Sequence, residues 1–297
     1  MAGHASVLPM TRRRACLVVP AVPSSKLEKG RTLRVDEVVV DLEDAVLPAA
    51  KDEARGAVVE VLGGEWAAES VAVRVNAIGT PWCHLDLVAL AGVAGTIVLP
   101  KVESAGDLAF ADRLLDGAGG DATRLLALIE TASGLQAAGE IARASRRLDG
   151  LILGYADLAA SLGRGAGEPG DWRFAQDALL VAARAAGIAA IDGPYLGIRD
   201  DDAFRAQVAH ARSLGFDGKW AIHPAQVDAL HEAFTPTEAE IEDARETLAA
   251  LEHAAAAGAG AVAAADRMLD EALAVSARRI LVRANLKGDS PRLGFGR

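Results

Sequence analysis

Eight short apolar runs rich in Val, Ile and Leu constrain the fold most strongly, because longer segments with helical periodicity separate them. The runs are residues 16–21, 35–42, 71–76, 96–101, 125–131, 148–155, 188–193 and 219–222. Helical candidates between them include residues 49–62, 105–115, 134–144, 172–186 and 201–214. This repetition predicts parallel strands joined by right-handed crossovers. Eight such units over roughly 225 residues favour a closed (β/α)8 barrel, the TIM barrel, over an open doubly wound sheet.

The composition suits such a domain and limits its partners. Of 297 residues, 51% are hydrophobic and only 4% aromatic, which fits helices packed over a buried sheet. The net charge of −10 and the lack of a long Lys/Arg run disfavour nucleic acid as a partner. Because no uninterrupted run of about 18 apolar residues occurs, no membrane partner is expected.

The cysteines and the N-terminal segment bear on the compartment. Two cysteines, Cys16 and Cys83, are too few for a disulfide framework, which favours a reducing environment. The basic residues 12–14 are followed by Pro20 and Pro23 rather than by an apolar helix of signal length. We therefore expect a cytoplasmic protein.

The pattern changes after residue 224, where the strand-like runs end. Residues 238–256 form a long helical segment that begins after Thr237, and glycines interrupt it at residues 258 and 260. One more helix is expected over residues 270–284, no further strand, and a mobile tail over 287–297. The sequence thus predicts a barrel domain, residues 1–235, and a C-terminal helical extension, residues 236–297.

Polar residues follow several of the predicted strands, at the end of the barrel where active sites lie. Asp41, Glu43 and Asp44 follow the second run, where Asp44 could instead cap a helix. Arg74 alternates with apolar neighbours, so its side chain should point into the barrel mouth. There it could grip a carboxylate or pair with Glu43 or Asp44, and both can hold together.

Glu130 and Asp157 end the fifth and sixth strands and are the candidate metal ligands. Neighbouring strands lie about 4.8 Å apart, so the two carboxylates should meet. Oxygen ligands without a nearby His or Cys suit Mg²⁺, with Mn²⁺ as the close alternative. Lys101 could form a Schiff base, but neighbouring acids would keep its amine charged, so a structural or electrostatic role is favoured. His223, which precedes Pro224, could simply shape a turn.

The ordered segments VVVDLEDAV, VRVNAIGTPW, VLPKVES, LIETASGL, LGYADLAASLG, AIDGPYLGIRD and GFDGKWAIHPAQV resemble the citrate lyase β-subunit-like (CitE-like) family of the HpcH/HpaI aldolase superfamily. The resemblance runs from about residue 14 to residue 280. The segments GKWAIHPAQV, AFTPTEAEIEDARETLAALE and RMLDEA look most like CoA-ester lyases that act on malyl-CoA, β-methylmalyl-CoA or citramalyl-CoA.

By resemblance, the fold is a TIM barrel with a C-terminal helical lid, assembled as a homotrimer or a dimer of trimers. Glu130 and Asp157 match the family's Mg²⁺ ligands, and Arg74 matches the residue that binds the carboxylate of the 2-oxo acid. Asp270 matches an acid of the lid that enters a neighbouring subunit's active site. Lys29 matches a basic residue that contacts the CoA phosphates. Ile222 and His223 match backbone and side-chain contacts along the CoA arm.

The implied activity is Mg²⁺-dependent, reversible cleavage of a 3-hydroxyacyl-CoA into an acyl-CoA and a 2-oxo acid, glyoxylate or pyruvate. Asp270 is the candidate acid–base group, and Asp44 and Glu43 would orient Arg74 and metal-bound water. The segment 21–24 (Ala-Val-Pro-Ser) departs from the Pro-Gly pattern of the family, which affects the expected acyl-CoA contacts.

Four alternatives remain open from the sequence. They are a CoA-independent aldolase of the same superfamily, a malate-synthase-like enzyme that also hydrolyses the thioester, a citrate lyase β subunit acting on an acyl-carrier-protein thioester, and a catalytically silent binding protein. The presence of Arg74, Glu130, Asp157 and Asp270 disfavours the last of these.

Overall fold

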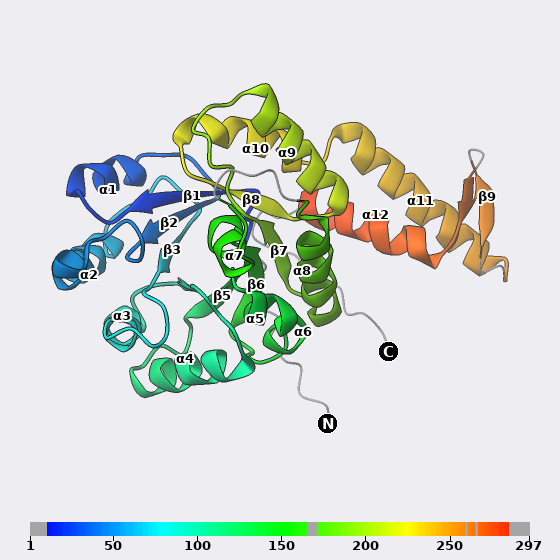
Figure 1. Cartoon of the computed structure of the whole chain (residues 1–297). Coiled ribbons are helices and arrows are strands. Elements are labelled where there is room, and N and C mark those ends of the chain that lie inside the picture. Colours follow the sequence, from blue (N-terminus) through cyan, green and yellow to red (C-terminus); the bar gives the residue numbers. More distant parts are fainter. Residues whose placement is uncertain (1–10, 166–170, 259–260, 265–266, 285–297) are drawn as a thin grey trace. The chain divides into compact units, whose positions relative to one another are not determined.

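The computed structural model describes residues 11–165, 171–258, 261–264 and 267–284 (Figure 1). These residues divide into two compact units. One spans residues 13–232, and the other comprises residues 11–12 together with the described part of 233–284. The predicted domain boundary at residues 235 and 236 remains a prediction.

Eight parallel strands close into a barrel in chain order, each hydrogen-bonded to the next and β8 to β1. They are β1 Ala15–Pro20, β2 Glu37–Asp41, β3 Ser70–Arg74, β4 Thr96–Leu99, β5 Arg124–Ile129, β6 Leu148–Leu153, β7 Ala189–Asp192 and β8 Gly218–Ala221. All eight predicted strands are present, and the predicted TIM-barrel fold is confirmed.

Helices follow the strands and surround the barrel (Figure 1). They are α1 Ser24–Arg31, α2 Lys51–Leu62, α3 Cys83–Leu90, α4 Ala105–Gly117, α5 Ala132–Gln136, α6 Ala138–Ile141, α7 Tyr155–Ser161, α8 Arg173–Ala186, α9 Asp202–Leu214 and α10 Val227–Phe234, with short 3-10 turns η1 Pro48–Ala50 and η2 Pro224–Gln226. The prediction of one helix over 134–144 was wrong, since the chain breaks at Ala137 into α5 and α6. Helices α3, α7 and α10 were not predicted.

Inward-facing side chains fill the barrel with a tightly buried core. It comprises Cys16, Val39, Ala72, Val98, Leu126, Leu128, Ile152, Ile191 and Trp220, with Val18 packed against it. Because side chains alternate along a strand, the next inward positions toward the C-terminal strand ends are Asp41 after Val39, Arg74 after Ala72 and Glu130 after Leu128. The floor of the mouth is therefore apolar, and its rim is charged.

The C-terminal unit contains helices α11 Glu238–Ala256 and α12 Glu271–Ala284, which pack against each other. Thr237 caps α11, with Glu240 N donating to its hydroxyl at 3.2 Å and Glu240 Oε2 accepting from Thr237 N at 2.8 Å. This agrees with the predicted helix start. The prediction of no further strands was wrong, because β9 Val262–Ala264 and β10 Arg267–Leu269 form an antiparallel pair. Three-residue strands are too short to leave a readable alternation.

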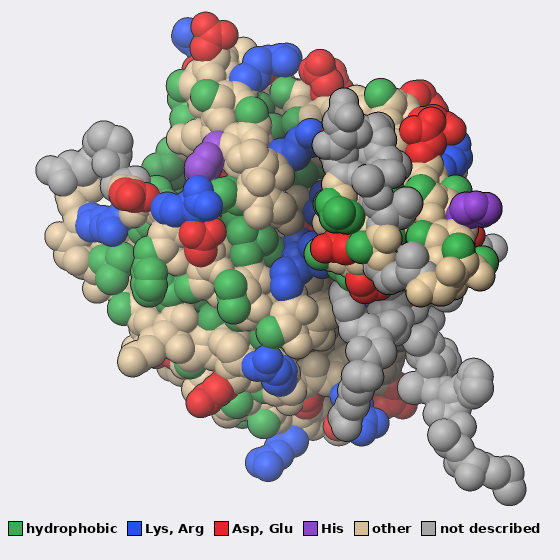
Figure 2. Space-filling view, turned by 90° about the vertical axis from the view of Figure 1, so that its right-hand side faces the viewer, with side chains coloured by type: hydrophobic (Ala, Val, Ile, Leu, Met, Phe, Trp, Pro, Cys, Tyr) green, Lys and Arg blue, Asp and Glu red, His purple; other side chains and the backbone are tan. Residues whose placement is uncertain are grey.

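The predicted mobile tail, residues 287–297, lies outside the described residues. Within the residues that are described, no helix combines the length and apolar character needed to cross a membrane. On the face shown in Figure 2, basic and acidic side chains are interspersed with hydrophobic and uncharged ones.

Candidate active site

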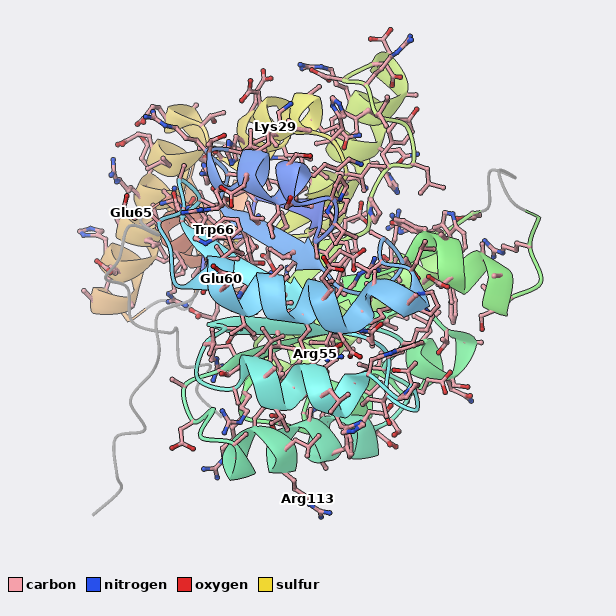
Figure 3. All side chains as sticks on the ribbon, turned by 90° about the vertical axis from the view of Figure 1, so that its left-hand side faces the viewer. Lys29, Arg55, Glu60, Glu65, Trp66 and Arg113 are labelled. Atoms are coloured by element: carbon pink, nitrogen blue, oxygen red, sulfur yellow. The ribbon has the colours of Figure 1, made fainter. Side chains whose placement is uncertain are left out.

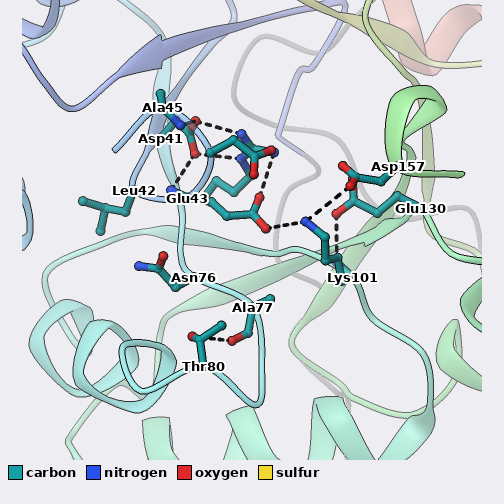
Figure 4. A network of polar contacts seen from close by, with 12 residues as sticks. Asp41, Leu42, Glu43, Ala45, Asn76, Ala77, Thr80, Lys101, Glu130 and Asp157 are labelled. Atoms are coloured by element: carbon teal, nitrogen blue, oxygen red, sulfur yellow. Dashed lines mark hydrogen bonds and ion pairs between the residues drawn. The ribbon is translucent and has the colours of Figure 1, made fainter. Parts of the chain in front are cut away.

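Arg74 lies at the centre of an acidic cluster at the ends of β2 and β3 (Figure 4). Asp41 and Arg74 are register partners across the two strands. The guanidinium donates through Nε and Nη2 to Asp41 Oδ1 and Oδ2, both at 2.8 Å. Its Nη1 lies 3.0 Å from Glu43 Oε2 and 3.5 Å from Asp44 Oδ2. Burial lowers the pKa of Arg74, but its bonds to Asp41 and the neighbouring charges outweigh this and raise it, so the group is always charged.

The predicted pairing of Arg74 with Glu43 and Asp44 is present, but Asp41, which had no role predicted from the sequence, is its main partner. Asp41 also accepts the backbone N–H groups of Glu43 and Ala45 at 2.9 and 3.2 Å, which holds the loop after β2. Asp44 caps no helix, because the next helical turn, η1, begins only at Pro48. Asp41 therefore occupies Nε and Nη2 of the guanidinium, while Nη1 faces Glu43 and Asp44.

Lys51 also holds the loop after β2 in place. Its buried ammonium donates to the carbonyl oxygens of Leu42 and Glu43 at 2.8 and 2.7 Å and lies 5.5 Å from the centre of the Trp82 ring. Burial lowers the pKa of Lys51, although nearby acids oppose the change. The carbonyls of the loop are therefore held in place, so the acid side chains keep their position around Arg74.

Glu130 extends from the end of β5 and is buried, with 2% of its surface exposed. Its Oε1 accepts the backbone N–H of Lys101 at 3.0 Å. A Cβ atom on Gly154 would lie 2.5 Å from both Cβ and Oε2 of Glu130, so only glycine leaves room for this carboxylate. Burial, and then the negative charges of Glu43 and Asp157, raise the pKa of Glu130 to about 8.

Asp157 comes from the first turn of α7, and its carboxylate lies beside Glu130 in Figure 4. Lys101 joins the two acids to the Arg74 cluster. Its Nζ lies 2.8 Å from Glu43 Oε1 and 3.6 Å from Asp157 Oδ1. Burial lowers the pKa of Lys101, but Glu43, Glu130 and Asp157 raise it overall, so the amine is protonated. A charged amine fits the expected electrostatic role and not that of a Schiff-base nucleophile.

Glu130 and Asp157 fit a hard divalent cation. A buried carboxylate whose pKa is raised by like charges gains stability when a cation neutralises it. In the described part of the chain, no group of three or more His, Cys, Asp or Glu residues is arranged to hold a metal. A cation here would rest on two protein carboxylates and complete its shell with water or substrate oxygens, as Mg²⁺ commonly does.

A second buried network, absent from the sequence predictions, joins strands β7 and β8 to helices α7 and α8. Lys219, which is fully buried, donates to Asp192 Oδ2 at 2.6 Å and to the carbonyl of Gly193. The Tyr155 hydroxyl donates to Asp192 and accepts from Gln176 Nε2, the latter at 2.8 Å. Because Tyr155 begins α7, this network anchors the turn that carries Asp157. The sequence does carry a signal for this network, because Lys219 lies inside a predicted strand and a buried ammonium needs an acidic partner.

The predicted CoA contacts lie in α1, which carries Lys29, and in the turn after β8, which carries Ile222 and His223. Lys29 is exposed in the last turn of α1 (Figure 3). The backbone N–H groups of Ile222 and His223 both donate to Gln226 Oε1, at 3.0 and 3.3 Å. His223 Nδ1 accepts from Ala225 N at 3.2 Å, so this residue does shape the turn before α10.

Asp270 lies in the C-terminal unit at the start of α12. Its Oδ1 accepts the backbone N–H groups of Ala272 and Leu273 at 3.0 and 3.2 Å, which makes it a helix cap in this structure. The side chain is exposed. Its predicted catalytic role, like the predicted CoA contacts, remains a prediction.

Comparison with known proteins places the chain among enzymes. Residues 14–224 match the family model described as HpcH/HpaI aldolase/citrate lyase. The chain is 36% identical over 306 residues to an L-malyl-CoA/beta-methylmalyl-CoA lyase of Cereibacter sphaeroides, covering 94% of this chain and 96% of the relative. It is 38% identical over 283 residues to a (3S)-malyl-CoA thioesterase of the same species, covering 91% and 94%.

Among solved structures, the chain is similar to CitE from Mycobacterium tuberculosis in complex with magnesium, acetoacetate and coenzyme A. The TM-score is 0.71 at 30% identity, covering 94% of this chain and 98% of CitE. These matches confirm the resemblance predicted from the ordered motifs, and with it the predicted enzyme class, a carbon–carbon lyase. The chain belongs to the HpcH/HpaI aldolase/citrate lyase family.

Proposed function

We propose that this protein is a Mg²⁺-dependent CoA-ester lyase that reversibly cleaves a 3-hydroxyacyl-CoA of the malyl-CoA, β-methylmalyl-CoA or citramalyl-CoA type. The products would be an acyl-CoA and glyoxylate or pyruvate. One observation carries the proposal: the carboxylates of Glu130 and Asp157 lie side by side at the C-terminal end of the barrel (Figure 4), and Lys101 and Glu43 link Asp157 to Arg74. The similarity to a malyl-CoA/beta-methylmalyl-CoA lyase over 94% of the chain supports the substrate class.

Glu130 and Asp157 would hold the cation, with Mn²⁺ as an alternative to Mg²⁺. When bound, it would act as a Lewis acid that stabilises negative charge on the 2-oxygen of the oxo acid. CitE from Mycobacterium tuberculosis, which is 30% identical, was solved with magnesium, acetoacetate and coenzyme A, and this supports the choice of ligands.

Arg74 would orient the carboxylate of the 2-oxo acid through Nη1. This nitrogen does not bind Asp41 and instead faces Glu43 and Asp44. Because Asp41 locks the rest of the guanidinium, the substrate would meet a preformed donor and not a mobile side chain. Asp44 is the more exposed of the two acids and the easier to displace, with its side chain 61% exposed against 8% for Glu43.

Proton transfer at the thioester would fall to Asp270. In cleavage, a base removes the hydroxyl proton of the 3-hydroxyacyl-CoA, the carbon–carbon bond breaks, and the thioester enolate takes a proton at its α-carbon. In condensation, Asp270 would remove that α-proton. This requires the C-terminal extension, residues 236–297, to act as a lid that also excludes water from the enolate, in a homotrimer or dimer of trimers. Lys29, Ile222 and His223 are the proposed CoA contacts.

Hydrolysis of the thioester is the second candidate activity, because the chain is 38% identical to a (3S)-malyl-CoA thioesterase. The two activities differ in which bond breaks. A lyase converts malyl-CoA into acetyl-CoA and glyoxylate, whereas a thioesterase releases free CoA and malate.

Incubation of the protein with malyl-CoA and Mg²⁺, followed by mass spectrometry, separates them. We expect acetyl-CoA to appear in step with glyoxylate, with free CoA at the level of the enzyme-free control. Free CoA and malate as the main products would replace the lyase proposal with the hydrolase.

A further inference from the structure

Lys101 has an unusual backbone and a central place among the charges of the mouth. Its φ angle is 51°, in the left-handed region that residues other than glycine seldom adopt. Such a conformation persists where the surrounding structure favours it, and it is common at functional sites. With this backbone, the N–H of Lys101 donates to Glu130 while its ammonium reaches Glu43 and Asp157.

Among the described residues, five carboxylates and two side-chain cations lie together at this end of the barrel, next to the ammonium of Lys51, which donates to backbone carbonyls. The carboxylates belong to Asp41, Glu43, Asp44, Glu130 and Asp157, and the cations to Arg74 and Lys101. Arg74 forms ion pairs with Asp41, Glu43 and Asp44, and 10% of its side chain is exposed. The ammonium of Lys101 contacts both groups of acids, the Arg74 cluster through Glu43 and the proposed metal ligands through Asp157.

The two contacts of the ammonium differ in strength. The Lys101 Nζ–Glu43 contact is a hydrogen bond at 2.8 Å to a buried acid, whereas the 3.6 Å contact to Asp157 is an ion pair with a side chain that is 38% exposed. A divalent cation on Asp157 would repel the ammonium and displace the weaker contact first. The Glu43 bond can stay, because it points toward Arg74 and away from the metal ligands (Figure 4).

We propose that Lys101 is a positioning residue that competes with the metal ion for Asp157 while holding Glu43 in place for Arg74. The inference deepens the proposed function and rests on its metal site. Loss of the ammonium would leave a more negative mouth, which binds Mg²⁺ more tightly and the anionic 2-oxo acid more weakly. A residue that only supported the fold would weaken both.

The test compares Lys101→Met with wild type by isothermal titration of Mg²⁺ into chelator-treated protein, and then of glyoxylate into the Mg²⁺-loaded protein. We expect the Kd for Mg²⁺ to fall about tenfold and the Kd for glyoxylate to rise about tenfold. Lys101→Arg keeps the charge and should stay within about twofold of wild type for Mg²⁺. Arg113→Met removes one charge from the outer side of α4 (Figure 3) and should change neither value.

Lys101→Gly provides a second variant that also suits the backbone, because glycine adopts a φ of 51° without strain and keeps the N–H that Glu130 accepts. It should bind Mg²⁺ as tightly as Lys101→Met. If wild type binds Mg²⁺ and both variants bind it equally or more weakly, the competition is wrong while the proposed function stands. If wild type binds no Mg²⁺, the proposed metal site fails, and this inference fails with it.

Discussion

Glu130→Gln should stabilise the metal-free protein at neutral and alkaline pH, although it removes a proposed metal ligand. The pKa of Glu130 is raised from an ordinary 4.5 to about 8 by burial and by Glu43 and Asp157. Between these values the folded protein holds a proton that the unfolded chain has lost, so stability falls as pH rises from about 4.5 through about 8. Glutamine keeps an oxygen for the N–H of Lys101 but carries no charge to desolvate.

The magnitude follows from the two pKa values. One pKa unit corresponds to about 1.4 kcal/mol, so the charge costs at most about 5 kcal/mol above pH 8 and on the order of 3 kcal/mol at pH 7. Urea unfolding in the presence of a chelator, at pH 5.5 and pH 8, measures this cost as the difference between wild type and variant. We expect that difference to be about 1.4 kcal/mol at pH 5.5, one unit above the ordinary pKa, and to grow by on the order of 2–4 kcal/mol at pH 8.

Glu60→Gln, an exposed change on α2 (Figure 3), is the matched control and should stay within about 0.5 kcal/mol of wild type at both pH values. Added Mg²⁺ should stabilise wild type and leave Glu130→Gln unaffected. The reasoning is refuted if wild type and Glu130→Gln differ by the same amount at both pH values, since Glu130 would then be ionised without cost.

Three further outcomes are expected. Asp41→Asn leaves the buried Arg74 without its bidentate partner and should cost roughly 3–5 kcal/mol in urea unfolding; a cost below about 1 kcal/mol would show that Glu43 and Asp44 suffice. Gly154→Ala places a Cβ 2.5 Å from Glu130, so calorimetry should show Mg²⁺ affinity reduced at least about tenfold; unchanged affinity would mean the carboxylate can move aside. Removing residues 236–297 should abolish turnover and leave Mg²⁺ binding intact, whereas normal turnover would exclude the lid.

The barrel could be predicted because every strand is an apolar run flanked by a helix-length segment, and all eight runs became strands. Arg74 and Glu130 could be placed at the mouth for the same reason, since side chains alternate along a strand and both continue inward-facing rows. The same alternation applies to Asp41, which follows Val39 by two positions, so its place beside Arg74 was within reach of the sequence.

Other features depend on distances between segments that one sequence does not specify. The bond between Lys219 and Asp192 requires the register of β7 and β8, and the contact between Lys101 and Asp157 joins the segment after β4 to the first turn of α7. The strands β9 and β10 are too short to show a period. The helix-capping contacts of Asp270 could not be predicted from the sequence either, because an aspartate at this position can act as a helix cap or as a catalytic acid.

The most direct test of the central claim is the Mg²⁺ dependence of condensation after all metal has been removed with a chelator. Acetyl-CoA or propionyl-CoA is mixed with glyoxylate over a range of Mg²⁺ concentrations, and the 3-hydroxyacyl-CoA product is followed by mass spectrometry for wild type and Glu130→Ala. We predict no product from wild type without Mg²⁺, full recovery as Mg²⁺ is added, and no product from Glu130→Ala at any concentration. Undiminished activity of the chelator-treated wild type, or Mg²⁺-dependent activity of Glu130→Ala equal to wild type, would contradict the account.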